Sequence, residues 1–116
     1  MSIQRLHVGP RLSEVAIHNG VVYLAGQVAE DSSLDITGQT QQVLAAIDRL
    51  LAEAGGDKTL VLQATIFLKT LADFPGMNAV WDRWVVHGHT PPRATVEAKL
   101  AKPEYLVEVK IIAAQR

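Results

Sequence analysis

The sequence of 116 residues contains no cysteine, and aromatic residues make up only 5% of it. The absence of cysteine excludes disulfides, thiolate metal ligands and a cysteine nucleophile. The sequence has 11 lysines and arginines and 12 aspartates and glutamates, which gives a net charge of −1. These charged residues are scattered, without a run of one sign. Such a chain cannot neutralise several phosphates at once, so we expect no nucleic-acid partner.

Long apolar stretches are missing as well. No stretch approaches the roughly 18 uninterrupted apolar residues of a membrane span, and the first residues contain no apolar signal core. We therefore expect a cytoplasmic protein without a membrane partner. The motifs G-x-S-x-G, G-x-G-x-x-G and G-x-x-x-x-G-K-[ST] are absent too, so serine-hydrolase, dinucleotide-binding and Walker-type functions have no support.

What remains is the composition of a folded protein, with 48% hydrophobic and 20% charged residues. This length is sufficient for one hydrophobic core but not for two. We therefore predict a single domain that spans residues 1–116.

Near the N-terminus, Asn19-Gly20 separates two apolar runs, after a first strand that ends before Gly9-Pro10. Both central residues of a type I′ turn need positive φ, and Asn-Gly supplies them, so a β-hairpin is predicted. The turn predicts two cross-strand pairs on one face, namely Val15 with Leu24 and Ile17 with Val22.

The middle of the chain switches between helical and strand spacing. A helical pattern ends at Gly55-Gly56, as is typical of a C′ glycine. A long strand follows, whose expected core face consists of Leu60, Leu62, Ala64, Ile66 and Leu68. Asp73 is then expected to cap a second helix that has Pro75 in its first turn.

These patterns predict an α+β fold with the order β-β-β-α-β-α-β-β. Each helix has one apolar stripe, so both should lie on the same face of one mainly antiparallel six-stranded sheet. The other sheet face is too apolar for exposure to water, which predicts self-association through it. Its expected apolar residues are Ala16, Val21, Tyr23, Ala25, Val61, Phe67, Leu106 and Ile112.

Arg93 and Glu108 are the candidate functional residues. They lie on two strand patterns joined by a short loop with Pro103, so we predict an antiparallel hairpin in which both side chains face the same space. The expected core face of the first strand consists of Ala94, Val96, Ala98 and Leu100. Its expected polar face consists of Arg93, Thr95, Glu97 and Lys99.

Two interpretations of this pair are open. In one, Arg93 makes a structural salt bridge with Glu97 or Glu108, and Glu108 only neutralises Arg93 or Lys110. In the other, the planar guanidinium binds a ligand carboxylate, and Glu108 holds or activates a water molecule.

Five other side chains invite a functional interpretation. His87 and His89 form an H-x-H pair, but without a third ligand we favour a solvated loop over a metal site. Trp81 and Trp84 are expected in the core. Asn78, on the same helix, faces either solvent or the rim of a pocket.

Several segments of the chain match a known family pattern, namely Gly9-Pro10, residues 22–28, residues 73–81, Pro92 to Glu97, and Val107-Glu108-Val109. Together these segments resemble the Rid family, also called YjgF-like, of reactive-intermediate (enamine/imine) deaminases. The resemblance covers nearly the whole chain and implies a chorismate-mutase-like fold. It also implies a homotrimer whose sheets form a central barrel, with sites in the clefts between subunits.

The resemblance implies hydrolysis of short-lived 2-imino acids to 2-keto acids and ammonia, with no cofactor. Arg93 matches the arginine that binds the substrate carboxylate, and Glu108 matches the glutamate that positions the attacking water. Backbone groups around Thr95 assist, and Gly26 and Asn78 match positions that line the cleft. An imine is already electrophilic, so orientation, a held water and a proton suffice.

Two positions differ from the best-known members of the family. Thr95 stands where they carry a cysteine, and Arg11 stands where they carry a tyrosine after Gly-Pro. The chain is therefore closer to a sister branch of the family. We expect Arg11, where it reaches the cleft, to shift preference toward a more acidic or larger imine.

An alternative from another class is a non-catalytic trimeric protein that binds small carboxylates, or a regulatory or chaperone-like protein on the same scaffold. Arg93 suits both classes. Glu108 favours chemistry, because a pure carboxylate binder gains nothing from a second anion nearby. An RNA-cleaving activity, a third possibility, finds no basic patch in this sequence.

Overall fold

The computed structural model of the protein describes residues 2–116. The elements follow the predicted order β-β-β-α-β-α-β-β, with two short 3₁₀ helices at Lys58–Leu60 and Leu71–Asp73. No helix among the described residues is both long and apolar enough to cross a membrane. In chain order, the elements are β1 (Gln4–Val8), β2 (Ser13–His18), β3 (Val21–Leu24), α1 (Ile36–Glu53), β4 (Val61–Leu68), α2 (Phe74–Trp84), β5 (Arg93–Glu97) and β6 (Val107–Ala114).

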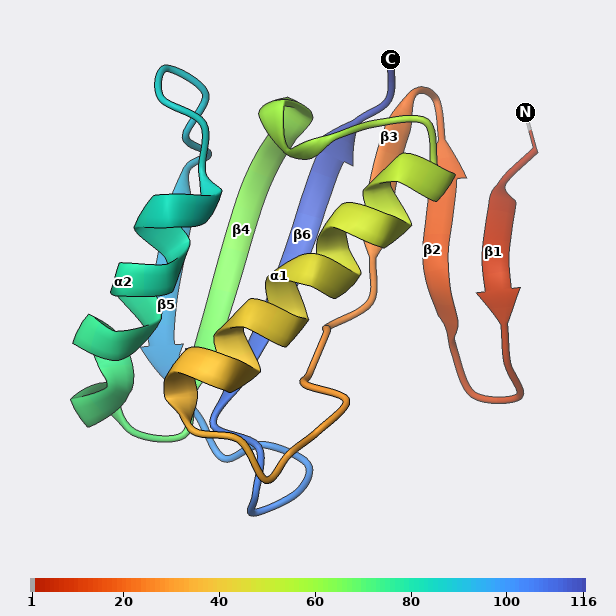
Figure 1. Cartoon of the computed structure of the whole chain (residues 1–116). Coiled ribbons are helices and arrows are strands. Elements are labelled where there is room, and N and C mark those ends of the chain that lie inside the picture. Colours follow the sequence, from red (N-terminus) through yellow and green to blue (C-terminus); the bar gives the residue numbers. More distant parts are fainter. Residues whose placement is uncertain (1) are drawn as a thin grey trace.

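The six strands form one mixed sheet in the order β1-β2-β3-β6-β4-β5. All neighbouring strands are antiparallel except β4 and β5, which are parallel. Both helices lie against the same face of this sheet (Figure 1). The prediction of an α+β fold with two helices on one face is thus confirmed. The sheet is open, with β1 and β5 as its edges, and the trimeric barrel stays a prediction.

The Asn19-Gly20 hairpin is confirmed in turn and register. Asn19 has φ 52° and Gly20 has φ 74°, and Val15 pairs with Leu24 while Ile17 pairs with Val22. All four of these paired side chains are buried under the helical layer. The pleat therefore places the alternate side chains of β2 and β3 on the uncovered face.

The helix ends follow the predicted capping residues, with one exception. Gly55 has φ 82° directly after the α1 C-cap residue, as a C′ glycine requires. Pro75 lies in the first turn of α2, as predicted. Asp73 occupies the N-cap position of α2, but its side chain makes no capping hydrogen bond.

The predicted hairpin between the last two strands is wrong. The end of β4 bonds to both sides of the connecting loop, because Ala98 N donates to Leu68 O (2.9 Å) and Lys69 N donates to Leu106 O (3.0 Å). Strand β4 therefore lies between β5 and β6. Helix α2 returns the chain from β4 to a parallel β5, and residues 98–106 then pass over one strand, a distance of roughly 10 Å.

The predicted faces of β5 are reversed as a consequence. Arg93 pairs with the buried Ala64, so Arg93 and Thr95 lie on the face covered by the helices. Ala94 and Val96 lie on the uncovered face instead, and Val96 is 44% exposed. The parallel pairing with β4 determines which side chains of β5 face the helices. An antiparallel hairpin with β6 does not predict the same faces.

A β-bulge at the start of β4 changes the predicted alternation of its side chains. The register shifts between Val61 and Gln63, so Val61 is buried whereas Leu62 is 49% exposed. The expected positions of these two residues are therefore exchanged. From Ala64 to Leu68 the alternation is the predicted one, with Ala64, Ile66 and Leu68 completely buried.

Gln39 connects the start of α1 to both long loops. Its side chain is fully buried, and Nε2 donates to the carbonyl oxygens of Ser32 (3.1 Å), Leu34 (3.0 Å) and Glu104 (3.0 Å). Its Oε1 accepts from Leu106 N at 3.0 Å. One amide thus fixes the loop before α1 and the loop that leads into β6.

We expect Gln39→Ala to lower the free energy of unfolding by about 2–4 kcal/mol, because several buried backbone groups lose their partner at once. Urea denaturation measures this change. The control is Gln41→Ala on the exposed side of the same helix, for which a change below about 0.5 kcal/mol is expected. Equal stability of the two variants would contradict the role assigned to Gln39.

Candidate functional site

Three of the predicted site residues come together between the edge strand β5 and helix α2. Arg93 and Thr95 point from β5 toward the helical layer, since their partners on β4 are the buried Ala64 and Ile66. Asn78 lies on α2, which runs in front of β5 (Figure 1). We call Asn78, Arg93 and Thr95 the arginine half-site.

Two aromatic residues of α2 hold the arginine in this place. The Cζ atom of Arg93 lies 5.7 Å from the ring centroid of Phe74 and 5.2 Å from that of Trp81. Phe74, Asn78 and Trp81 have the spacing i, i+4 and i+7, so they form one stripe along the helix. This stripe faces β5, which explains why Asn78 joins Arg93.

Arg93 remains an available cation. Burial lowers the pKa of its guanidinium, and the carboxylate of Asp82 raises that pKa again in part. An arginine stays protonated despite such shifts. Within residues 2–116 the salt bridges are His7 with Glu53 and Arg116 with Asp57, so the structural salt bridge of Arg93 with Glu97 or Glu108 is wrong.

The arginine half-site also contains two unpaired polar atoms. Across residues 2–116, the buried side-chain oxygen or nitrogen atoms without a hydrogen-bond partner are Asn78 Oδ1 and Thr95 Oγ1. Buried polar atoms are nearly always paired, because leaving one unpaired costs about 1–3 kcal/mol. Both exceptions fall on residues that the sequence had already indicated for a site.

Glu108 and Gly26 come together elsewhere, on the uncovered face. Glu108 pairs with Phe67 on β4, and the next residue, Val109, bridges to Gln27 beyond the end of β3. A Cβ atom at Gly26 would lie 2.1 Å from Glu108 Oε2, so any other residue at this position would displace the carboxylate from its present place. We call Gly26 and Glu108 the glutamate half-site.

The prediction that Arg93 and Glu108 face the same space is therefore wrong within one chain. They lie on opposite faces of the sheet, two strands apart, which corresponds to roughly 10 Å along the sheet. Arg11 is further away, in the turn between β1 and β2. Since β1 and β5 are the two edges of the sheet, about 24 Å separates Arg11 from the strand of Arg93.

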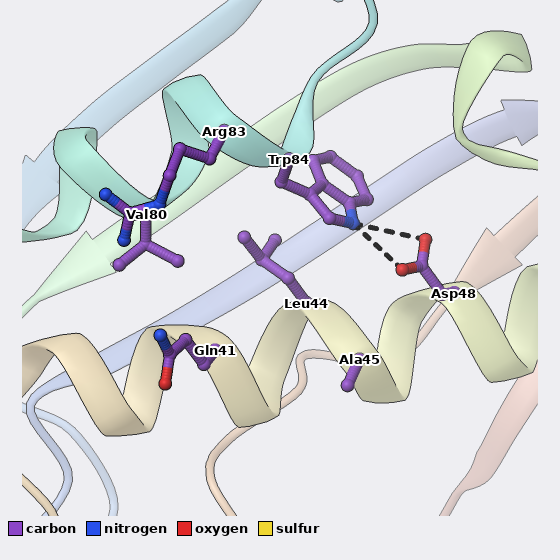
Figure 2. Close-up of a pocket in the computed structure, with 7 residues that line it drawn as sticks. All are labelled: Gln41, Leu44, Ala45, Asp48, Val80, Arg83 and Trp84. Atoms are coloured by element: carbon purple, nitrogen blue, oxygen red, sulfur yellow. Dashed lines mark hydrogen bonds between the residues drawn. The ribbon is translucent and has the colours of Figure 1, made fainter.

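A shallow groove of about 260 Å³ between the helices contains none of the predicted site residues. In Figure 2, Arg83 and Asp48 lie toward its two ends, and both Asp48 carboxylate oxygens accept from Trp84 Nε1 at 3.1 Å. Trp81 and Trp84 are buried, as predicted. His87 and His89 are exposed, and residues 2–116 contain no group of three metal-ligating side chains.

Sequence reasoning assigned Trp81 to the core and did not connect it, or Phe74, with Arg93. The signal was present in the i, i+4, i+7 spacing with Asn78, which was already a candidate. This spacing could be interpreted only with the knowledge that α2 packs against β5. The wrong hairpin prediction did not place these two elements next to each other.

Comparison with known proteins agrees with this fold. The family profile described as Endoribonuclease L-PSP matches residues 2–115. A RutC family protein from Haemophilus ducreyi is 51% identical over 112 residues, which cover 97% of this chain and 96% of that protein.

Solved structures give the same result. The crystal structure of a YjgF-family protein from Neisseria meningitidis superposes with a TM-score of 0.97 at 49% identity, over 100% of this chain and 97% of that one. A conserved Rid-family protein from Yersinia pestis has a TM-score of 0.85 at 29% identity, over 92% and 90% of the two chains. The fold is thus that of a small α+β protein of the YjgF type. The chain belongs to the RutC/YjgF/Rid family.

Proposed function

We propose that the protein is a homotrimeric 2-imino acid deaminase whose site forms where two chains meet. One chain supplies the arginine half-site, and the next supplies the glutamate half-site. The observation that carries this proposal is the pair of unpartnered buried oxygens, Asn78 Oδ1 and Thr95 Oγ1, together with Arg93, which makes no salt bridge within residues 2–116. The separation of Arg93 from Glu108 by the sheet supports a site between chains.

In this mechanism Arg93 binds the substrate carboxylate through its paired N–H groups. Glu108 accepts a hydrogen bond from a water molecule and orients its oxygen toward the imine carbon. The water oxygen adds to the carbon of the C=N bond, and one proton of the water passes to the imine nitrogen, which gives a carbinolamine. The hydroxyl proton of the carbinolamine then passes to the amino nitrogen, the carbon–nitrogen bond breaks, and a 2-keto acid and ammonia leave.

Arg11 can contribute to the proposed site only when two chains associate. In one chain it lies at the sheet edge opposite to β5, so it reaches an arginine half-site only on another chain. There its guanidinium would attract a second anionic group, which favours a more acidic imine. The chain's own arginine half-site does not involve Arg11.

Two other functions are less well supported. A non-catalytic carboxylate binder would use the arginine half-site but leaves the Gly26–Glu108 contact without a purpose. The family description names an endoribonuclease, but this chain has a net charge of −1 and scattered basic residues, whereas RNA binding depends on neutralising phosphates.

The proposal is tested by generating 2-imino acids in solution with an amino-acid oxidase and following their disappearance. We expect the protein to accelerate the decay, because it orients both the substrate and the water. Equal decay rates with and without the protein would contradict the enzyme. If the protein then still bound pyruvate, the carboxylate-binding alternative would take its place.

A further inference from the structure

The side chain of Arg93 lies against two aromatic rings of helix α2. Its guanidinium lies over the rings of Phe74 and Trp81, with Cζ 5.7 Å and 5.2 Å from their centroids. It makes no salt bridge within residues 2–116. The orientation of this cation is therefore set by aromatic faces.

Aromatic faces and carboxylates hold a cation with different consequences. A carboxylate takes up two N–H groups of an arginine and neutralises its charge. A ring face attracts the same cation through its quadrupole and leaves the N–H edges unoccupied. An arginine held by rings thus keeps both its charge and its planar fork for a ligand.

The two rings belong to the hydrophobic core or pack against it. Trp81 is 5% exposed and belongs to the core, while Phe74 is partly buried and packs against it. Both rings come from the stripe of α2 that carries Asn78. The long Arg93 side chain, which crosses from the edge strand, loses freedom of rotation against this rigid surface before any ligand arrives.

We propose that Phe74 and Trp81 are positioning residues that orient the Arg93 guanidinium for the carboxylate of the substrate. This inference rests on the proposed function, since it assumes that Arg93 binds a carboxylate. Ordering the guanidinium in advance lowers the entropy lost on binding. The rings therefore act on binding of the carboxylate and leave the attack on the imine carbon unchanged.

The test uses Phe74, because it is less buried than Trp81. Phe74→Leu keeps an apolar side chain without a ring face, Phe74→Tyr keeps the face, and Phe74→pentafluorophenylalanine keeps the shape but reverses the quadrupole. Binding of pyruvate, a stable 2-keto acid, is measured by calorimetry for the full-length protein. Pyruvamide, which lacks the carboxylate, is the control ligand.

We expect Phe74→Leu and the pentafluorinated variant to weaken pyruvate binding about threefold to tenfold, whereas Phe74→Tyr stays within about twofold. Pyruvamide binding should be the same in all variants. In the imine assay the loss should appear in KM with kcat retained. The pentafluorinated variant keeps the test valid where Phe74→Leu does not fold.

The outcomes separate the two proposals. If Phe74→Leu and the pentafluorinated variant bind pyruvate like the wild type while Arg93→Ala does not bind it, the positioning role is wrong and the proposed site stands. If Arg93→Ala binds pyruvate as tightly as the wild type, Arg93 is not the carboxylate ligand, and both proposals fail.

Discussion

Arg93→Ala is expected to lower kcat/KM for a 2-imino acid by about 10²–10³-fold, which corresponds to the loss of a partly buried, charge-assisted hydrogen-bonded pair. The change removes a side chain that makes no salt bridge within residues 2–116, so the fold should persist. Imine decay measures the rate, and urea denaturation checks the fold. Arg93→Lys should restore only part of the activity, because an ammonium lacks the planar fork.

Arg83→Ala provides the matched control for this variant. Arg83 is exposed on α2 and borders the groove between the helices, away from the proposed site. It carries the same charge as Arg93, so any effect of net charge alone should appear in both variants. Equal activities of Arg93→Ala and Arg83→Ala would show that the carboxylate is bound elsewhere.

Mixing two inactive variants is expected to restore activity. Arg93→Ala destroys the arginine half-site, Glu108→Gln destroys the glutamate half-site, and each homotrimer then lacks every complete site. A mixed trimer contains one junction at which an intact Arg93 meets an intact Glu108. With random assembly from equal amounts, about three quarters of the trimers are mixed and about a quarter of the wild-type activity returns.

The measurement compares co-expressed or jointly refolded chains with a simple mixture of preformed homotrimers. Recovery should appear only where the chains exchange. A double variant that carries both changes in one chain is the control, because its mixture with either single variant creates no intact junction. Activity that stays at the level of the single variants after exchange would contradict a site shared between two chains.

Much of the fold could be predicted from the sequence because local chemistry dictates it. Asn19-Gly20 specifies its turn and thereby the register of β2 and β3, and Gly55 specifies the end of α1. Alternation identifies β4 as a strand, although it gives no sign of the bulge at Leu62. A bulge needs one extra residue and no special side chain.

The topology around the site could not be obtained in the same way. Residues 98–106 are long enough either to close a hairpin or to pass over one strand, and nothing local decides between these. The choice is made by α2, which returns the chain parallel to β4 and places β5 at the edge. The candidates Arg93 and Glu108 were therefore identified by residue type, while their relative position required the structure.

The position of the two half-sites on opposite faces of one sheet has a consequence for chains that carry a defect in either of them. In the proposed trimer each chain serves two neighbours at once, one through its helix-covered face and the other through its bare face. A defect in Arg93 therefore removes a different site from a defect in Glu108 of the same chain. Where intact and defective chains assemble together, a chain with both defects disables two sites of the trimer, whereas a chain with one defect disables one. A gene that encodes both defects is therefore expected to be more dominant than a gene that encodes either defect alone.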